Sequence, residues 1–112
     1  MNKNSLFNFF YNSDINSYND IIYIIKTKGT SIAEFHLTDG RVLTKYISLK
    51  ECKSQLPQDL FININKGILI NKNHIQHISR YTYYLDNGET FDGKLKNAKL
   101  HSTLASKINE IK

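Results

Sequence analysis

The chain has 112 residues, a formal net charge of +5 and about 40% apolar residues. This length suits one compact domain, and the apolar content supports one modest core, so a disordered chain is excluded. The charge excess lies in residues 61–112, which carry eight Lys or Arg and four Asp or Glu, against seven and six in residues 1–60. A basic second half suits a polyanionic partner such as nucleic acid, although net charge alone identifies partners weakly.

Redox and targeting features indicate a cytoplasmic protein. Cys52 is the only cysteine, so no intramolecular disulfide can form and a reducing compartment is expected. The first eleven residues contain a short aromatic run but lack the longer apolar stretch and cleavage site of a signal peptide. No run approaches about 18 apolar residues, so we expect no membrane partner.

The first elements are expected to be strands. Residues 6–11 predict a first strand and residues 12–19, rich in Asn, Ser and Asp, predict a loop. Residues 1–19 are therefore predicted to be an N-terminal strand and loop in front of a domain at residues 20–112. The continuous β-branched and aromatic run at residues 21–25 predicts a buried strand, followed by a turn at residues 26–30.

A hairpin and a short helix come next. Residues 31–37 alternate, with Ile32, Phe35 and Leu37 as expected inward positions, and Asp39-Gly40 predicts a hairpin to a strand at residues 41–47. The helix is indicated by a capping box and by one apolar face, and Pro57 ends it. Cys52 is expected to be a small core residue on that face, with redox sensing as the less favoured alternative. The capping pair is Ser48 and Glu51, and the apolar face is Leu49, Cys52 and Leu56.

Short strands and turns continue to residue 92, with Asn87-Gly88 as the strongest hairpin signal. From residue 94 the apolar spacing becomes helical. The predicted fold class is therefore mostly β: an elongated fold of short β-sheets with one short internal helix and a C-terminal amphipathic helix. The strands are expected at residues 60–64, 68–70, 75–79, 82–85 and 89–92, and the helical stripe consists of Leu95, Leu100, Leu104, Ile108 and Ile111.

The sequence contains no recognisable catalytic, metal or cofactor site. His74 and His77 are three residues apart, which puts them on opposite faces of a strand. The five glycines are isolated, so there is no Gly-rich phosphate loop, and no nucleophile motif is present. Asp39 and Asp59 are better explained as turn residues than as catalytic carboxylates. We therefore expect no enzyme activity, no metal and no cofactor.

Basic, amide-rich segments between the apolar strands are the strongest functional signal. Lysine suits phosphate oxygens, and asparagine can pair bidentately with adenine in the major groove. A single Asn is better explained by a turn, but several such segments in one small β domain favour DNA or RNA. The segments contain Lys26 and Lys28; Asn63, Asn65, Lys66, Asn71, Lys72 and Asn73; and Lys94, Lys96 and Lys99.

The order of these segments resembles the LytTR family of DNA-binding domains. Asp20-Ile-Ile-Tyr-Ile24 resembles its opening strand, and His36-Leu-Thr-Asp-Gly-Arg41 its next hairpin. Ser48-Leu-Lys-Glu51 with Leu56-Pro57 is similar to its helix and exit. Phe61-Ile-Asn-Ile-Asn-Lys-Gly-Ile-Leu-Ile-Asn71 resembles its central signature, F.RiHRS.iVN. Leu85-Asp-Asn-Gly88 and residues 91–100 are similar to its closing hairpin and vSR segment, so the resemblance spans roughly residues 20–104.

The resemblance implies an elongated β domain whose loops enter the major groove, and a stand-alone regulator without a receiver domain. By position, Asn65 and Lys66 match the His-Arg pair of the signature, Asn71 matches its Asn, and Lys94 or Lys96 matches the Arg of the vSR segment. Because Lys cannot reproduce the bidentate Arg fork on guanine, the base preference is expected to differ from that of other members. The resulting set of predicted DNA contacts is Lys26, Lys28, Thr30, Asn63, Asn65, Lys66, Asn71, Lys72, Lys94 and Lys96.

The predicted function is sequence-specific binding of duplex DNA in bacterial transcription regulation. The alternative is a protein-interaction or RNA-binding module on the same fold that has lost specific DNA readout. Besides duplex DNA, a second copy on repeated half-sites or a regulatory protein is a candidate partner. We expect Asn65–Lys66 and Lys94–Lys96 to read bases about one helical turn apart, near 10 base pairs, while Lys26–Thr30 positions the backbone.

Overall fold

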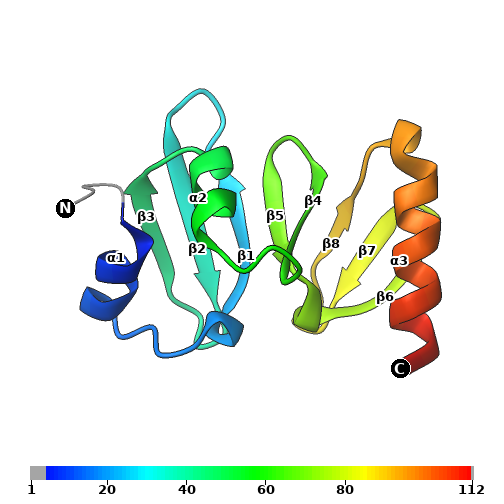
Figure 1. Cartoon of the computed structure of the whole chain (residues 1–112), viewed down its shortest axis with the longest axis horizontal. Helices are drawn as coiled ribbons and strands as arrows, with labels where there is room; N and C mark the ends of the chain where they lie inside the picture. Colours follow the sequence, from blue (N-terminus) through cyan, green and yellow to red (C-terminus); the bar gives the residue numbers. More distant parts are fainter. Residues whose placement is uncertain (1–4, 112) are drawn as a thin grey trace.

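Two antiparallel β-sheets lie beside each other along the long axis of the molecule (Figure 1). The computed structural model describes residues 5–111, so residues 1–4 and 112 of the predicted segments lie outside it. The described part measures 40 × 27 × 22 Å, which confirms an elongated, mostly β fold. The first sheet has the order β3-β2-β1-β5-β4 and the second the order β6-β7-β8.

The boundaries of the elements agree closely with the expected strands and turns from residue 21 onward. The helices are α1 (Leu6–Asn12), α2 (Leu49–Gln55) and α3 (Ala98–Ile111), and the 3-10 turns are η1 (Tyr18–Asp20), η2 (Lys72–His74) and η3 (Leu95–Asn97). The strands are β1 (Ile21–Lys26), β2 (Ile32–Leu37), β3 (Val42–Tyr46), β4 (Phe61–Asn65), β5 (Ile68–Asn71), β6 (Ile75–Ser79), β7 (Thr82–Leu85) and β8 (Thr90–Asp92).

Strand β1 is the centre of the first sheet and is buried on both faces. It pairs with β2 on one side and with β5 on the other. A bulge between Ile21 and Tyr23 breaks the alternation, so Ile21 and Ile24 pack with α1 and α2. Ile22 and Tyr23 instead pack with the second sheet. The continuous apolar run therefore predicted this buried strand correctly.

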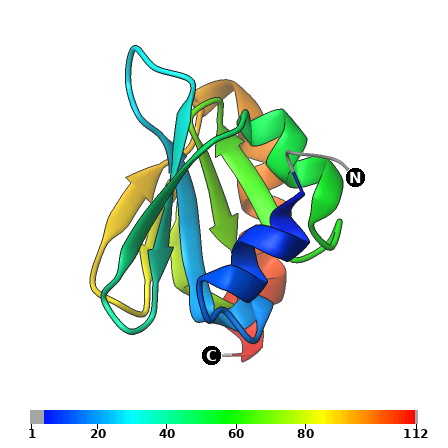
Figure 2. The ribbon, with the colours of Figure 1, turned by 90° about the vertical axis from the view of Figure 1, so that its left-hand side faces the viewer.

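The first element is a helix, not the strand expected at residues 6–11. Leu6 and Phe10 are four residues apart and both buried, and the ring centroids of Phe9 and Phe35 are 5.1 Å apart. Such spacing puts apolar side chains on one helical face, and packing against β2 outweighs the β propensity of aromatic residues. Figure 2 shows α1 and α2 together on one face of the first sheet.

Strand β2 alternates as predicted, but with a different inward set. Ala33, Phe35 and Leu37 are buried, whereas Ile32 is only half-buried. A period of two requires positions 33, 35 and 37 to share a face, so the expected inward position of Ile32 is wrong. The hairpin at Asp39-Gly40 is confirmed, with Gly40 at a φ of +92°.

Helix α2 begins and ends where the sequence indicated. Ser48 Oγ accepts the N–H of Glu51 at 3.0 Å, while the Glu51 carboxylate accepts from the Ser54 hydroxyl rather than completing a capping box. Leu49, Cys52 and Leu56 are buried as expected. Burial, with a smaller contribution from Glu51, raises the pKa of the Cys52 thiol to about 12, which fits a core residue rather than a reactive one.

Helix α3 covers the second sheet, but its apolar stripe starts later than predicted. Ile108 is buried and Leu104 is half-buried, whereas Leu95 and Leu100 are exposed. The helix begins at Ala98, and residues 95–97 form the 3-10 turn η3, so Leu95 is out of phase with the buried face. The side chain of Ile111 lies outside the described part of the chain. His101 takes a core position that the stripe did not predict.

Candidate nucleic-acid interface

Three connections from distant parts of the sequence meet at one edge of the molecule, at the top of Figure 1. They are the β1–β2 loop (residues 27–31), the β4–β5 turn (residues 66–67) and the β8–α3 connection (residues 93–97). The backbone N–H of Lys26 donates to Gly67 O at 2.9 Å. This bond joins the end of β1 to the β4–β5 turn, so the first two connections start side by side.

A β-bulge joins the β4–β5 turn to the β8–α3 connection. The register of β4 shifts between Asn63 and Asn65, which takes Ile64 out of the ladder with β5. Ile64 O accepts the backbone N–H of Lys94 at 3.1 Å. The side-chain amide of Asn65 donates to Asp92 O at 3.0 Å, and its Oδ1 accepts the N–H of Gly67 at 2.8 Å. All three connections are therefore fixed relative to one another.

The connections and helix α2 surround a shallow, open depression lined by lysine. No acidic side chain is found among the described residues that line it. Partial desolvation lowers the pKa of Lys94, and repulsion from Lys96 and Lys66 lowers it further. The lining residues include Lys26, Lys50, Lys53, Lys66, Lys94, Lys96, Asn63, Asn65 and Asn97. We call this surface the lysine-lined depression.

Six of the ten predicted contacts line this depression: Lys26, Asn63, Asn65, Lys66, Lys94 and Lys96. Lys28 and Thr30 are exposed in the adjoining β1–β2 loop. The Thr30 hydroxyl stabilises that loop, because it donates to Thr27 O at 2.9 Å and accepts the N–H of Ile32 at 3.1 Å. The Asn63 amide donates to Ile68 O at 3.1 Å within the β4–β5 hairpin.

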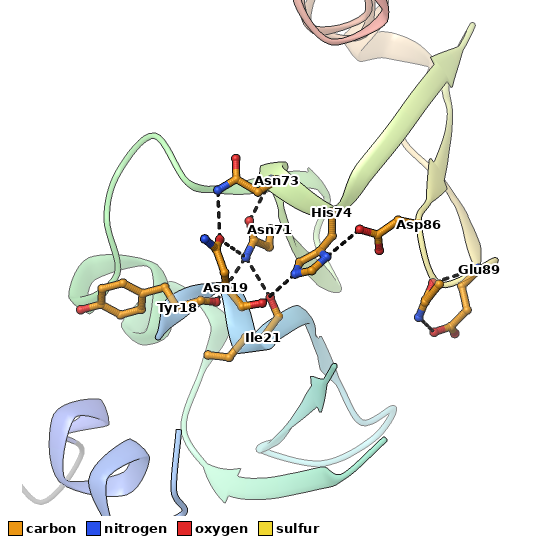
Figure 3. Close-up of polar contacts among 9 residues, drawn as sticks. Tyr18, Asn19, Ile21, Asn71, Asn73, His74, Asp86 and Glu89 are labelled. Carbon is orange, nitrogen blue, oxygen red and sulfur yellow. Dashed lines mark hydrogen bonds and ion pairs between the residues drawn. The ribbon is translucent and has the colours of Figure 1, made fainter. Parts of the chain in front are cut away.

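Asn71 is a structural residue, which corrects its prediction as a DNA contact. Its side chain is fully buried, and Nδ2 lies 2.9 Å from Ile21 O and 3.2 Å from Tyr18 O (Figure 3). Its Oδ1 accepts the backbone N–H of Asn73 at 2.9 Å. A buried amide with these partners holds the turn before β1 against the turn after β5, and it presents no surface to a ligand.

Lys72 and His74 do not line the depression. Lys72 lines an adjoining groove, which shares Lys53 with the depression and includes Leu104 and Lys107 of α3. His74 Nε2 donates to Asn19 O at 2.7 Å, and its Nδ1 lies 2.9 Å from the Asp86 carboxylate (Figure 3). His74 thus joins the turn before β1 to the hairpin of the second sheet, and the structure separates Lys72 from the other predicted lysines.

The two predicted base-reading segments lie side by side in the structure, and their expected spacing of about 10 base pairs on DNA stays a prediction. A helical turn of DNA is about 34 Å long. Asn65 and Lys94, however, belong to segments joined by direct hydrogen bonds at 3.0 and 3.1 Å.

Sequence reasoning missed Lys50, Lys53 and Asn97, which also line the depression. Lys50 and Lys53 are three apart on the capped helix, so they share one side of it, and this signal was present in the sequence. Lys53 Nζ donates to Phe61 O at 3.0 Å, which anchors α2 to β4. Asn97 gave no signal, because only the folded β8–α3 connection brings it to the other residues.

His101 braces the β8–α3 connection from the core side. Its ring is buried; Nε2 donates to Lys94 O at 2.7 Å and Nδ1 accepts from the Tyr83 hydroxyl at 2.7 Å. Burial raises the pKa of Tyr83 to about 12, so this hydroxyl stays a donor. Gly93 leaves room for the ring, because a Cβ at that position would overlap His101 and lie 3.1 Å from Ile64 O.

Two negative findings apply to the described residues, 5–111. In that part of the chain, no group of three or more His, Cys, Asp or Glu side chains is placed to hold a metal ion. No helix in it is both long enough and apolar enough to cross a membrane.

The comparisons with known proteins agree with the resemblance seen in the sequence. The family model for the LytTr DNA-binding domain matches residues 15–99, most of the chain. The chain therefore belongs to the LytTR family of DNA-binding domains. A solved LytTr DNA-binding domain from Bacillus cereus has the same fold, with a TM-score of 0.65 and 24% identity over 76% of this chain and 80% of that chain. No curated protein matches the chain.

Proposed function

We propose that this domain binds duplex DNA sequence-specifically in the major groove and acts in bacterial transcription regulation in the cytoplasm. The observation that carries the proposal is the lysine-lined depression, where lysines from β1, α2, the β4–β5 turn and the β8–α3 connection converge. Six lysines without an acidic neighbour in the described lining form an attractive site for phosphate oxygens. Membership of a family of DNA-binding domains supports duplex DNA as the polyanion.

The proposed contacts are of two kinds, those to the phosphate backbone and those to base edges. Lys26, Lys28 and Lys50 stand at the margins, on β1, the β1–β2 loop and α2, where they suit the phosphate backbone. Asn65 ends β4 and suits a base edge, while Lys66 in the β4–β5 turn suits a phosphate beside it. The Asn65 amide makes two hydrogen bonds in the structure, and its NH₂ and carbonyl each have capacity for a second, as adenine recognition requires.

The proposal is tested by fluorescence anisotropy with a labelled random duplex between 50 and 200 mM salt. If about six phosphates are contacted, the log–log slope should be near −5, at about −0.9 per phosphate. A flat affinity over this range would contradict DNA binding and favour a protein-interaction module. A single-stranded RNA competitor that displaces the duplex at equal nucleotide concentration would favour the RNA-binding alternative.

Matched variants separate this surface from net charge. Lys94→Ala combined with Lys96→Ala removes two positive charges from the depression, and Lys72→Ala combined with Lys107→Ala removes two from the other groove. The first pair should reduce the salt slope by about 1.8, at about 0.9 per lost phosphate contact, and the second should leave it unchanged. Equal losses from both pairs would show that only overall charge matters. Selection of bound duplexes from a random pool then gives the preferred site.

A further inference from the structure

A large, exposed apolar side chain lies on the connection that supplies two lysines to the lysine-lined depression. Leu95 is 69% exposed, and it lies between Lys94 and Lys96, both of which line the depression. On its other side it borders a small hollow that Arg80 and Tyr81 of the β6–β7 turn help to form. Exposure of this leucine side chain to water is unfavourable, whereas its position between two cations suits a ligand that carries both phosphate and apolar groups.

The backbone that carries Leu95 is held firmly. The N–H of Lys94 donates to Ile64 O at 3.1 Å, and Lys94 O accepts the N–H of Asn97 at 3.0 Å and Nε2 of His101 at 2.7 Å. These bonds form the 3-10 turn that removes Leu95 from the buried face of α3. The exposure of Leu95 is therefore fixed by the fold before a ligand arrives, which favours recognition.

The chemistry of the major groove limits what such a side chain can recognise. Lysine is a flexible point charge and does not distinguish one phosphate from the next. The apolar feature on the base edges of the major groove is the 5-methyl group of thymine. An apolar residue flanked by phosphate-binding lysines can therefore discriminate bases where the lysines cannot.

We propose that Leu95 packs against the 5-methyl group of a thymine and so specifies thymine at one position of the bound site. This inference rests on the proposed DNA-binding function and deepens it. Leu95 lies on the connection that is hydrogen-bonded to the β4–β5 turn, so its thymine falls within a few base pairs of any base that Asn65 contacts. Asn65 with adenine and Leu95 with thymine together give the domain a preference for A·T pairs.

The test replaces each thymine of a selected duplex in turn by deoxyuridine, which lacks only the 5-methyl group. Affinities are measured by anisotropy at one fixed salt concentration for the intact chain and two variants. Leu95→Ala removes the proposed contact. Leu100→Ala makes the same chemical change at another exposed leucine, which lines the groove with Lys72 and Lys107. Circular dichroism confirms that each variant is folded.

The wild-type chain and Leu100→Ala should both lose about fourfold in affinity at one thymine, the value of one buried methyl group. Leu95→Ala should bind the unsubstituted duplex more weakly than the wild-type chain does. Replacing that one thymine by deoxyuridine should then cause no further loss of affinity. Leu95→Met, which keeps an apolar contact, should restore sensitivity. If no thymine shows the loss, or if Leu95→Ala keeps it, the inference is overturned while salt-sensitive DNA binding still stands. Absence of any duplex binding would overturn the proposed function itself.

Discussion

The same dipeptide, Asn-Lys, flanks strand β5 on both sides and has opposite roles at its two ends. Asn65-Lys66 precedes the strand and lies in the lysine-lined depression. Asn71-Lys72 ends it, where Asn71 is fully buried and Lys72 lies in a different groove. Asn65, Lys66 and Asn71 match positions of the family signature, so the sequence alone gives the two asparagines the same expected role. What separates them is the environment at each end of the strand.

That environment follows from the neighbours of β5. At its beginning, the strand and the β4–β5 turn are hydrogen-bonded to the ends of β1 and β8, and the Asn65 side chain stays partly exposed. At its end, the chain passes under the turn before β1, and Asn71 meets Tyr18 O and Ile21 O. Asparagine near a strand end therefore indicates a surface contact only when no other chain segment covers it.

The largest expected effect is the loss of stability in Asn71→Ala. Removing the amide leaves the buried Ile21 carbonyl and the Asn73 N–H without this partner, at a cost on the order of 3 kcal/mol. Asn65→Ala should cost only about 1 kcal/mol, because water reaches the groups it leaves. Urea unfolding measures both changes. DNA affinity per folded molecule should survive in Asn71→Ala, and sequence preference should weaken at one position in Asn65→Ala. The reverse pattern would contradict the division of roles.

A second substitution disturbs the support of the depression without touching its lysines. Gly93→Ala places a Cβ against the His101 ring and near Ile64 O, so the β8–α3 connection must shift. We expect a loss of about 2 kcal/mol in unfolding free energy, within the range for overpacking, together with weaker DNA binding. Gly88→Ala serves as the control, since its Cβ meets open space and only its positive φ opposes the change. Unchanged DNA affinity in folded Gly93→Ala would show that the connection is dispensable.

The two lysines of the comparison should differ in their salt dependence. Lys66→Ala should reduce the log–log slope of DNA affinity by about 0.9, equivalent to about eightfold in affinity for each tenfold change in salt. Lys72→Ala removes the same charge from the other groove and should leave the slope unchanged. Anisotropy at four salt concentrations separates them. A slope that falls equally in both variants would extend the DNA surface onto the second groove.

Cys52, like Asn71, stabilises the fold and is not a DNA contact. Cys52→Ala should lower the unfolding free energy by about 1 kcal/mol at pH 7 and leave DNA affinity nearly intact. Burial raises the thiol pKa to about 12, so the folded thiol stays protonated in a range where the unfolded one ionises. The stability linked to this pKa difference is present below about pH 9 and is lost towards pH 12, so the gap between wild type and variant should shrink above pH 9. A thiol reagent that reacts quickly at pH 8 and abolishes DNA binding would make Cys52 a sensor.

Local sequence signals predicted the fold well wherever one pattern decided the structure. The apolar run of β1, the Asp39-Gly40 and Asn87-Gly88 hairpins and the Ser48 cap all act within a few residues. The strand prediction for residues 6–11 is wrong, because their aromatic side chains favour strands in isolation, while packing on Phe35 selects a helix. The prediction that Leu95 belongs to the apolar stripe of the last helix is wrong, because α3 starts three residues after it.

The sequence predicted which types of residue form the candidate site, but not which individual residues belong to it. Lysine and asparagine between strands indicated nucleic acid, and six predicted residues do converge. Asn71 could not be excluded from the sequence, because its burial depends on a turn about 50 residues away. His101 and Gly93 could not be found either, because their roles arise only where His101 of α3 meets the β8–α3 connection.

The hydrogen bonds that assemble the depression also set the order in which the protein becomes active. Strands β1, β2 and β3 pair with sequence neighbours, and we expect their meander to form early. The Lys26–Gly67 bond must wait for β5, and the Lys94–Ile64 bond for a segment more than 25 residues further on. As a ribosome releases the chain from the N-terminus, the nascent domain thus carries a folded sheet but no assembled binding edge. A chain interrupted before β8 would keep most of its lysines and still lack the Lys94–Ile64 bond that brings the β8–α3 connection to the depression.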